Sequence, residues 1–303
     1  MTLTAPTRPI FLLAVATLLI LAGVLAARGA FWYQSADFFC LYQGARSLAE
    51  GRDPYDISWW HSVTGGVYPD PWRGHAASSC GNRYAYPLWT AAAMAPIGIL
   101  PLELAASAWM ALSIGAAVFG AAALWRSHGA PRRNAALFAA LVFTSQPFWV
   151  LLVGGQMTGI MLGLVGALAL WVARARESAA GLALALLALK PQLVVLTIPS
   201  IALRALIDRR RRIVTTAVAA GIAMVGVPTL LVPAWPLEWL RDVGTSRVLD
   251  IGPLATAWGA ATDLLGHPAW GIVFVALVVG PCLLLARGLD MSSVLALSLP
   301  LSL

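Results

Sequence analysis

The chain has 303 residues, of which 60% are hydrophobic and only 11% are charged, and its formal net charge is +7. A soluble domain carries about 25% charged residues, so the composition excludes an ordinary soluble protein. It predicts an all-α, polytopic transmembrane helical bundle. We expect residues 1–303 to form a single transmembrane domain that is surrounded by membrane lipids. The arginines lie in short loops between apolar segments, which is typical of membrane orientation, so nucleic acid is not expected as a partner.

Apolar runs along the chain are the candidates for membrane helices, each of which needs about 20 residues to cross the hydrocarbon core. The first run lacks a compact cleavage site of small residues and leads into further runs, so it is interpreted as a retained helix and not as a signal peptide. No polar tail follows the last run, and we therefore expect the natural protein to continue beyond it. The predicted segments are 10–27, 102–125, 135–153, 157–173, 179–192, 193–207, 213–232, 269–286 and 291 onward.

These segments alternate so that the arginine clusters fall on one side together with the N-terminus, and the positive-inside rule identifies that side as the cytoplasm. We expect a multi-pass protein of the cytoplasmic (inner) membrane with two outer segments, 28–101 and 233–268. Tryptophan favours the headgroup interface and is concentrated in or beside both segments, which predicts outer juxtamembrane helices that lie on the membrane. These tryptophans are Trp32, Trp59, Trp60, Trp72, Trp89, Trp235, Trp239, Trp258 and Trp270.

The first outer segment begins with a predicted helix over 38–50, which Gly51 ends. Asp37 stands at its start, immediately after the first span. As an N-cap, its carboxylate would accept backbone N–H bonds, and at the membrane rim it would also be well placed to accept a proton; the two interpretations are compatible. Cys40 and Cys80 both lie outside in this scheme, where an oxidising compartment permits a disulfide. Two separate buried thiols are the alternative.

Two polar residues, Arg83 and Gln156, lie where outer segments meet apolar ones. Arg83 precedes a short apolar stretch, 88–100, that fits a re-entrant or surface helix. This arginine is interpreted as an interface anchor, with phosphate binding as the alternative. Gln156 follows paired glycines in an outer turn, where it either binds sugar hydroxyls or belongs to a tight turn.

Lys190 is the only lysine among the 20 basic residues of the chain. It stands in an apolar run and is followed by Pro191, which lacks a backbone donor and breaks a helix. The segments 179–192 and 193–207 are too short for two full spans, so they predict a hairpin of short helices broken at Lys190. An ammonium at this depth costs at least a few kcal/mol, and such a charge marks a functional site that faces a polar cavity or a partner.

In their order along the chain, these pieces resemble the membrane glycosyltransferases of family 87 in the GT-C superfamily. Two positions depart from the family's usual pattern: Leu88 stands where a second proline is common, and Thr158 where an asparagine is common. The departures concern substrate specificity more than fold. The matching pieces are Asp37 with Tyr42, Ala45 and Leu48, then Gly51-Arg52-Asp53-Pro54-Tyr55, Tyr86-Pro87, Gly155-Gln156, the run from Gly181 to Lys190-Pro191, and the arginines at 209–212.

The resemblance implies a GT-C-like fold and transfer of a hexose, often mannose, from a polyprenyl-phosphate sugar to a lipid or glycan acceptor at the outer face. It also implies that the carboxylate just after the first helix, here Asp37, is the catalytic base. Lys190 is expected to bind the donor phosphate, with Arg83 as the weaker candidate. The residues expected to contact the substrates are Tyr42, Tyr86 and Gln156.

The residues themselves fit this chemistry. Asp37 would take the proton of the acceptor hydroxyl, and Lys190 in a low-dielectric groove would stabilise the charge that grows on the departing phosphate. A double displacement would need a second carboxylate as nucleophile, so we expect inversion. No carboxylate pair has metal-site spacing, so we expect neither a metal nor another cofactor. A lipid or anion transporter or flippase, which the charged, broken hairpin suits equally, and a non-catalytic assembly subunit are the competing interpretations.

Overall fold

The computed structural model describes residues 37–64, 84–127, 154–191 and 197–245, with single residues at 80, 142, 144, 145, 148, 151, 152, 194, 288, 289, 291, 293 and 294. The regular elements among these residues are all helices, which confirms the prediction of an all-α protein. Predicted segments 10–27 and 269–286 lie outside the described residues, as do Arg83 and nearly all of 135–153 and of the run from 291 onward.

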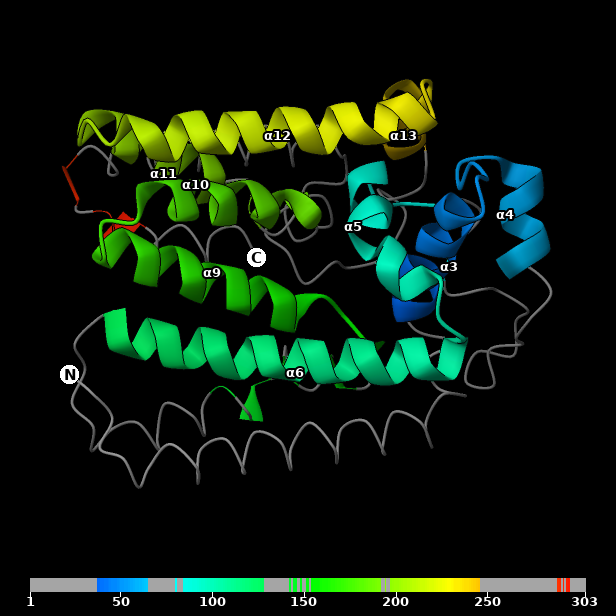
Figure 1. The fold of residues 1–303 in the computed structure, drawn as a ribbon, viewed down its shortest axis with the longest axis horizontal. Helices are drawn as coiled ribbons and strands as arrows, with labels where there is room; N and C mark the ends of the chain where they lie inside the picture. The colour runs from blue at the N-terminus through cyan, green and yellow to red at the C-terminus, as the bar shows by residue number, and fades with distance from the viewer. Residues whose placement is uncertain are drawn as a thin grey trace, which may run out of the picture.

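Two of the described helices are long and apolar enough to cross a membrane. These are α6, Leu102–Ser127, and α12, Arg211–Leu231, and they match the predicted segments 102–125 and 213–232. The apolar helix α9, Thr158–Ala173, is shorter and matches the predicted segment 157–173. All three run along the long dimension of the molecule (Figure 1). The outer side of α12 is strongly exposed, with Leu230 at 84%, and such an apolar surface suits a lipid environment.

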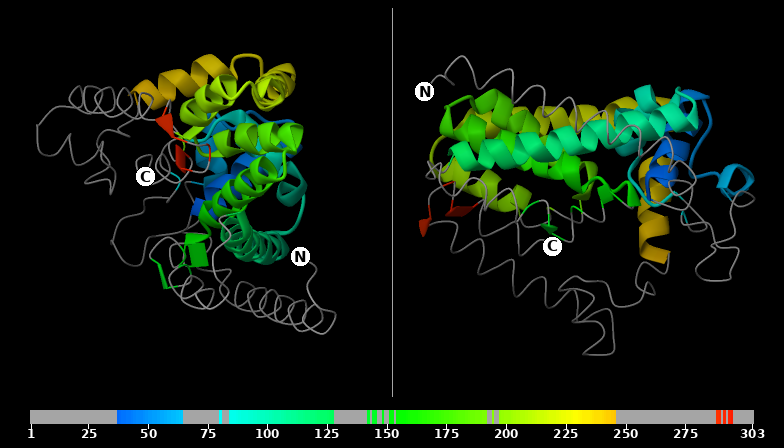
Figure 2. Two further views of the ribbon diagram at one scale, coloured as in Figure 1. Left: turned by 90° about the vertical axis from the view of Figure 1, so that its left-hand side faces the viewer. Right: turned by 90° about the horizontal axis from the view of Figure 1, so that it is seen from below.

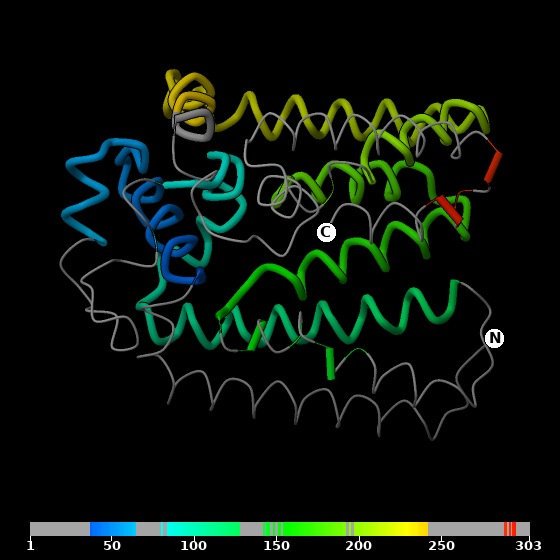
Figure 3. The backbone as a smooth tube through the Cα atoms, turned by 180° about the vertical axis from the view of Figure 1, so that it is seen from behind, coloured from blue at the N-terminus to red at the C-terminus, as the bar shows by residue number. Residues whose placement is uncertain are grey.

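Helices α6 and α9 approach each other closely because glycines stand at their contact, and they lie side by side in both Figure 1 and Figure 3. A Cβ on Gly120 would lie 2.8 Å from the backbone nitrogen of Gly163, and one on Gly166 would lie 2.6 Å from the Cα of Gly120. Backbone atoms cannot give way as a flexible side chain can, so these positions exclude larger residues. Small residues at helix contacts are typical of membrane proteins.

The predicted break at Lys190 is present. Helix α10, Glu177–Leu186, tightens into a 3-10 turn, η2, Leu187–Leu189, and regular structure ends there. Lys190 has φ −132° and ψ 76°, which are not helical angles. The next helix, α11, covers Thr197–Ile207. Because Pro191 has no N–H, it could not have continued the hydrogen-bond ladder of α10.

Four shorter helices gather at one end of the long ones (Figures 1 and 2). Three come from the predicted first outer segment and one, α13, from the second. The opposite end of the long helices carries the arginine-rich connections, with Arg126 in the last turn of α6, Arg174 at the end of α9 and Arg211 at the start of α12. The four helices are α3, Asp37–Ala49, α4, Ile57–Thr64, α5, Leu88–Gly98, and α13, Trp235–Thr245.

A largely aromatic core holds these four helices together. A disulfide joins Cys40 on α3 to Cys80, with Cα atoms 5.1 Å apart. The Tyr84 ring meets the Trp60 ring edge-on at 5.4 Å. Trp60 and Trp235 are 0% and 1% exposed, so these two indoles pack in the protein core; the interface position predicted for the tryptophan-rich outer segments stays a prediction.

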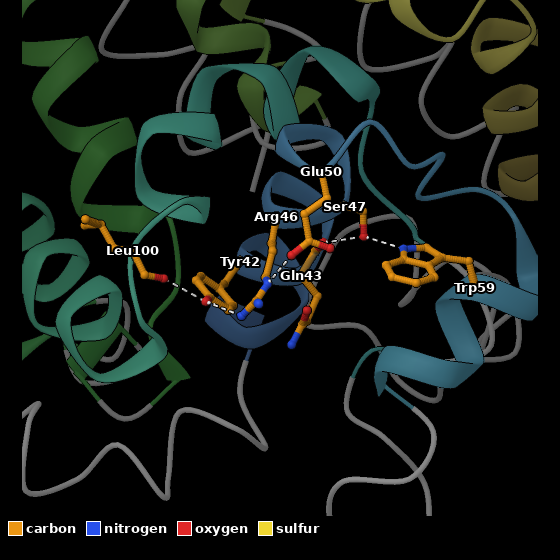
Figure 4. Close-up of polar contacts among 7 residues, drawn as sticks. All are labelled: Tyr42, Gln43, Arg46, Ser47, Glu50, Trp59 and Leu100. Atoms are coloured by element: carbon orange, nitrogen blue, oxygen red, sulfur yellow. Dashed lines mark hydrogen bonds and ion pairs between the residues drawn. The ribbon is translucent and has the colours of Figure 1, made fainter.

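Helix α3 is fixed on two sides by side-chain hydrogen bonds (Figure 4). On one side, the Tyr42 hydroxyl donates to the carbonyl of Leu100 at 2.8 Å and accepts from Arg46 at 3.2 Å. On the other, the Trp59 indole of α4 donates to the Ser47 hydroxyl at 2.9 Å. These contacts set the position of the helix that begins with Asp37.

Candidate functional site

Three polar residues from distant parts of the sequence meet at the end of the long helices where α3 and α5 lie. The Lys190 ammonium donates to the Gln156 side-chain oxygen at 2.6 Å, and Gln156 also hydrogen-bonds the Asp37 carboxylate. Because a carboxylate only accepts, the Gln156 amide nitrogen must be the donor to Asp37. One glutamine therefore links an acid to the chain's only lysine, and the predicted residues Asp37, Gln156 and Lys190 form one cluster.

Asp37 is set up as a stronger base than an ordinary carboxylate. Burial raises the pKa of Asp37 above its usual value of 3.8, while the positive charge of Lys190 and the hydrogen bond from Gln156 pull that pKa back down. Burial is the larger effect. A carboxylate whose pKa is raised accepts a proton from a hydroxyl more readily, which is the property a general base needs.

Tyr86, another predicted site residue, lies beside this cluster. Burial and the negative charge of Asp37 both raise the pKa of the Tyr86 hydroxyl, so it stays protonated. The Tyr86 ring packs against Tyr84 with centroids 5.9 Å apart, and its carbonyl accepts from the Tyr55 hydroxyl at 2.6 Å. The aromatic core therefore holds Tyr86 next to the carboxylate.

The turn that carries Gln156 requires a glycine. Gly155 has φ +59°, in the left-handed region that glycine adopts at little cost. Its carbonyl accepts from the Trp109 indole of α6 at 2.7 Å. The Trp109 ring also stacks on Phe38, the residue after Asp37, at 6.0 Å. Trp109 thus contacts both pieces of chain that bring Gln156 and Asp37 together.

Helix α5 contacts the turn before Lys190 through two side chains, Trp89 and Thr90, which donate to the carbonyls of Ala188 and Leu189. Trp89 is one of the tryptophans predicted to lie at the membrane interface, whereas Thr90 and Trp109 carry no prediction from the sequence. Each of these three side chains has one polar atom within an apolar stretch of sequence. That feature indicates a hydrogen bond, since a buried indole N–H or hydroxyl usually finds a partner. The sequence does not indicate which carbonyl that partner is.

The remaining predicted site residues are Tyr42 and Arg83. Tyr42 is 1% exposed, and its hydroxyl is engaged by Leu100 and Arg46, so the structure gives it a role in packing, while substrate contact stays a prediction. Arg83 lies outside the described residues. Within the described part of the chain, no three His, Cys, Asp or Glu residues are grouped as metal ligands would be. The expectation that no metal is needed also stays a prediction.

The family model described as glycosyltransferase family 87 matches residues 84–299. The match contains Tyr86, Gln156 and Lys190 and begins after Asp37, so the assignment of Asp37 rests on its place in the cluster and on the resemblance of the first outer segment. No curated protein and no solved structure matches the chain.

Proposed function

Because this chain belongs to glycosyltransferase family 87 and is therefore a glycosyltransferase, we propose that it moves a hexose, mannose, from a polyprenyl-phosphate sugar to a lipid or glycan acceptor. The observation that carries the proposal is the cluster of Asp37, Gln156 and Lys190. It places a carboxylate of raised basicity and an ammonium at one point, as displacement of a phosphate from a sugar carbon requires.

The chemical step gives the two charged groups separate roles. The acceptor oxygen attacks the anomeric carbon, and Asp37 takes the proton of the acceptor hydroxyl. The bond from that carbon to the phosphate oxygen breaks, and its electron pair stays with the lipid phosphate. Lys190 carries three N–H donors, of which Gln156 takes one. The ammonium stabilises the leaving phosphate, and a single displacement inverts the anomeric configuration.

We place the reaction at the outer face of the cytoplasmic membrane, within one polytopic transmembrane domain. The arginine-rich connections at the other end of the long helices support this orientation by the positive-inside rule. The Cys40–Cys80 disulfide, close to Asp37 in α3, supports an oxidising compartment on the site's side. The apolar helices of the chain indicate a membrane protein, and a membrane-bound enzyme is suited to a donor that carries a polyprenyl chain.

The test is a transfer assay with full-length protein reconstituted in liposomes. Radiolabelled mannosyl, glucosyl and galactosyl phosphoryl polyprenols are offered separately, each with a lipid extract of the host membrane as acceptor. We expect label from the mannosyl donor to appear in a new species heavier than its acceptor by one hexose, with inverted anomeric configuration. Absence of transfer from all three donors contradicts the proposed donor class, and label that crosses the bilayer on an unchanged lipid indicates a flippase.

The metal prediction is tested in the same assay. We expect EDTA to leave the initial rate of transfer unchanged, because the proposed mechanism uses Lys190 in place of a metal ion as the cation at the phosphate. A rate that falls with EDTA and returns with Mg²⁺ or Mn²⁺ would show that a metal shares the phosphate site.

A further inference from the structure

The backbone immediately before Lys190 depends on donors from outside its own helix. In a continuous helix, the carbonyls of Ala188 and Leu189 would accept from N–H groups four residues further on. Here the helix ends in the 3-10 turn at Leu189, and Pro191 follows. Buried carbonyls almost always have partners, and among the described residues these two carbonyls find theirs on another element.

Helix α5 supplies both. The Trp89 indole N–H donates to the Ala188 carbonyl at 2.9 Å, and the Thr90 hydroxyl donates to the Leu189 carbonyl at 2.9 Å. Thr90 is fully buried, with 0% of its surface exposed, so bulk water does not reach it to replace the hydroxyl. Two consecutive residues of α5 therefore hold the last two carbonyls before Lys190.

The same stretch of chain borders the acid of the cluster. Tyr86, whose hydroxyl experiences the charge of Asp37, is followed by Pro87 and then by the first residue of α5, Leu88. The start of α5 thus adjoins Asp37 on one side and holds the turn before Lys190 on the other. Helix α5 therefore packs against α3, the helix that Asp37 begins, and also contacts the turn before Lys190.

We infer that Thr90 is a positioning residue for sugar transfer. Its bond to the Leu189 carbonyl fixes the direction in which the next residue, Lys190, presents its ammonium to Gln156 and to the donor phosphate. Trp89 supports the same turn through Ala188. The inference rests on the proposed function only for the phosphate; the placement of the ammonium is a property of the protein itself.

That placement can be observed directly because Lys190 is the chain's only lysine. Lysine labelled with ¹³C at Cε therefore gives a single side-chain NMR signal from these 303 residues. We expect Thr90→Val, which keeps the shape and removes the hydroxyl, to shift this signal, and Thr90→Ser to leave it near the wild-type position.

Thr64→Val is the matched control. Thr64 is 2% exposed and its hydroxyl also donates to a carbonyl, that of Trp60 at 2.6 Å, but within its own helix α4. The substitution has the same chemistry in a place that does not touch the turn before Lys190. We expect the Lys190 signal to be unchanged in this variant.

Kinetics supply the second measurement. We expect Thr90→Val to lower kcat/KM for the donor by about tenfold, since a buried carbonyl loses its donor and the ammonium moves, and Thr90→Ser to restore most of it. In a Lys190→Gln background the same substitution should cost nothing further, because residues that act through one another are not additive.

Two results would overturn the inference: an unshifted Lys190 signal in folded Thr90→Val, or losses that add fully in the double variant. If Thr90→Val does not accumulate in membranes, Trp89→Phe, which removes the donor to Ala188 together with part of the ring that packs on Trp235, is measured in its place with the same expected shift. A shifted signal in a protein whose wild-type form transfers no sugar would refute the proposed function and leave the positioning of Lys190 standing.

Discussion

Burial and charge act in opposite directions on the carboxylate at the centre of the site. Removal of Asp37 from water raises its pKa, and the neighbouring Lys190 and Gln156 lower it by favouring the ionised form. Burial is the larger of these effects, so the carboxylate is more basic than a solvated one. The lysine that we propose to stabilise the departing phosphate therefore also lowers the pKa of the proposed base.

This balance predicts a change in pH dependence. A base must be deprotonated to act, so transfer should fall as pH falls through the raised pKa of Asp37, on a limb that lies above 3.8. Lys190→Gln removes a positive charge that lowers this pKa. We therefore expect Lys190→Gln to have a higher pKa at Asp37. In a plot of kcat/KM against pH, its residual activity should fall on the acidic side at a higher pH than that of the wild type.

The control for this experiment is Arg212→Gln, which removes an exposed positive charge from the arginine-rich end, beyond the reach of an unscreened interaction with Asp37. Its limb should coincide with that of the wild type. A Lys190→Gln limb at the wild-type pH, or at a lower one, would mean that the titrating group is not Asp37.

At the scale of the helices, the spacing between α6 and α9 depends on residues without side chains. Gly120 faces the backbone of Leu162 and Gly163 so closely that even a methyl group has no room. We expect Gly120→Ala to destabilise the protein by about 1–3 kcal/mol, the usual cost of overpacking, measured as a lower midpoint of thermal unfolding in detergent.

A matched substitution on α12 separates packing from helix propensity. Gly221 has open space where its Cβ would stand, and alanine favours a helix over glycine by about 1 kcal/mol. Gly221→Ala should be neutral or slightly stabilising. Equal destabilisation by the two substitutions would show that α6 and α9 do not approach each other as closely as described.

Composition and local signals predicted much at this scale, because they depend on neighbouring residues. The length of the apolar runs predicted helices α6, α9 and α12, and the Lys190-Pro191 pair predicted the break after α10. The same signals did not indicate that Trp89 meets Ala188, 99 residues further along the chain, or that Trp235 is buried. Such contacts depend on how helices pack, which no local pattern encodes.

The candidate site was predictable in its members more than in its contacts. Lys190 was predictable because a charged residue in an apolar run is costly and marks a functional site. Asp37 was predictable because it begins a helix directly after a predicted span. That Gln156 links the two depends on Gly155 adopting a left-handed conformation and on Trp109 holding its carbonyl. Neither is visible without the fold.

At the scale of the whole molecule, the long helices lie alongside one another and the shorter ones gather at one end (Figure 3), and the two ends differ in chemistry. The cluster and the helices α3, α4, α5 and α13 occupy one end, and the arginine-rich connections occupy the other. The proposed orientation places the first outside the cell membrane and the second in the cytoplasm. Exposed serines offer a probe at each end, Ser62 on α4 and Ser178 on α10.

We expect Ser62→Cys to react with a membrane-impermeant maleimide in intact spheroplasts, and Ser178→Cys to react only after the membrane is permeabilised. Both variants carry Cys282→Ser so that the new cysteine is the one labelled, since Cys40 and Cys80 are joined. Mass spectrometry of the purified protein reports the labelling. The reverse pattern would place the site in the cytoplasm.

The central claim is that Asp37 takes the acceptor's proton, and single-turnover transfer by Asp37→Asn tests it most directly. Asparagine keeps the shape and one side-chain oxygen but has no basicity, so the rate should fall roughly 100- to 10,000-fold, the usual worth of a general base, with normal protein in the membrane. Glu50→Gln, which neutralises an exposed carboxylate at the C-terminal end of the same helix, should transfer at the wild-type rate. Wild-type transfer by Asp37→Asn would contradict the account.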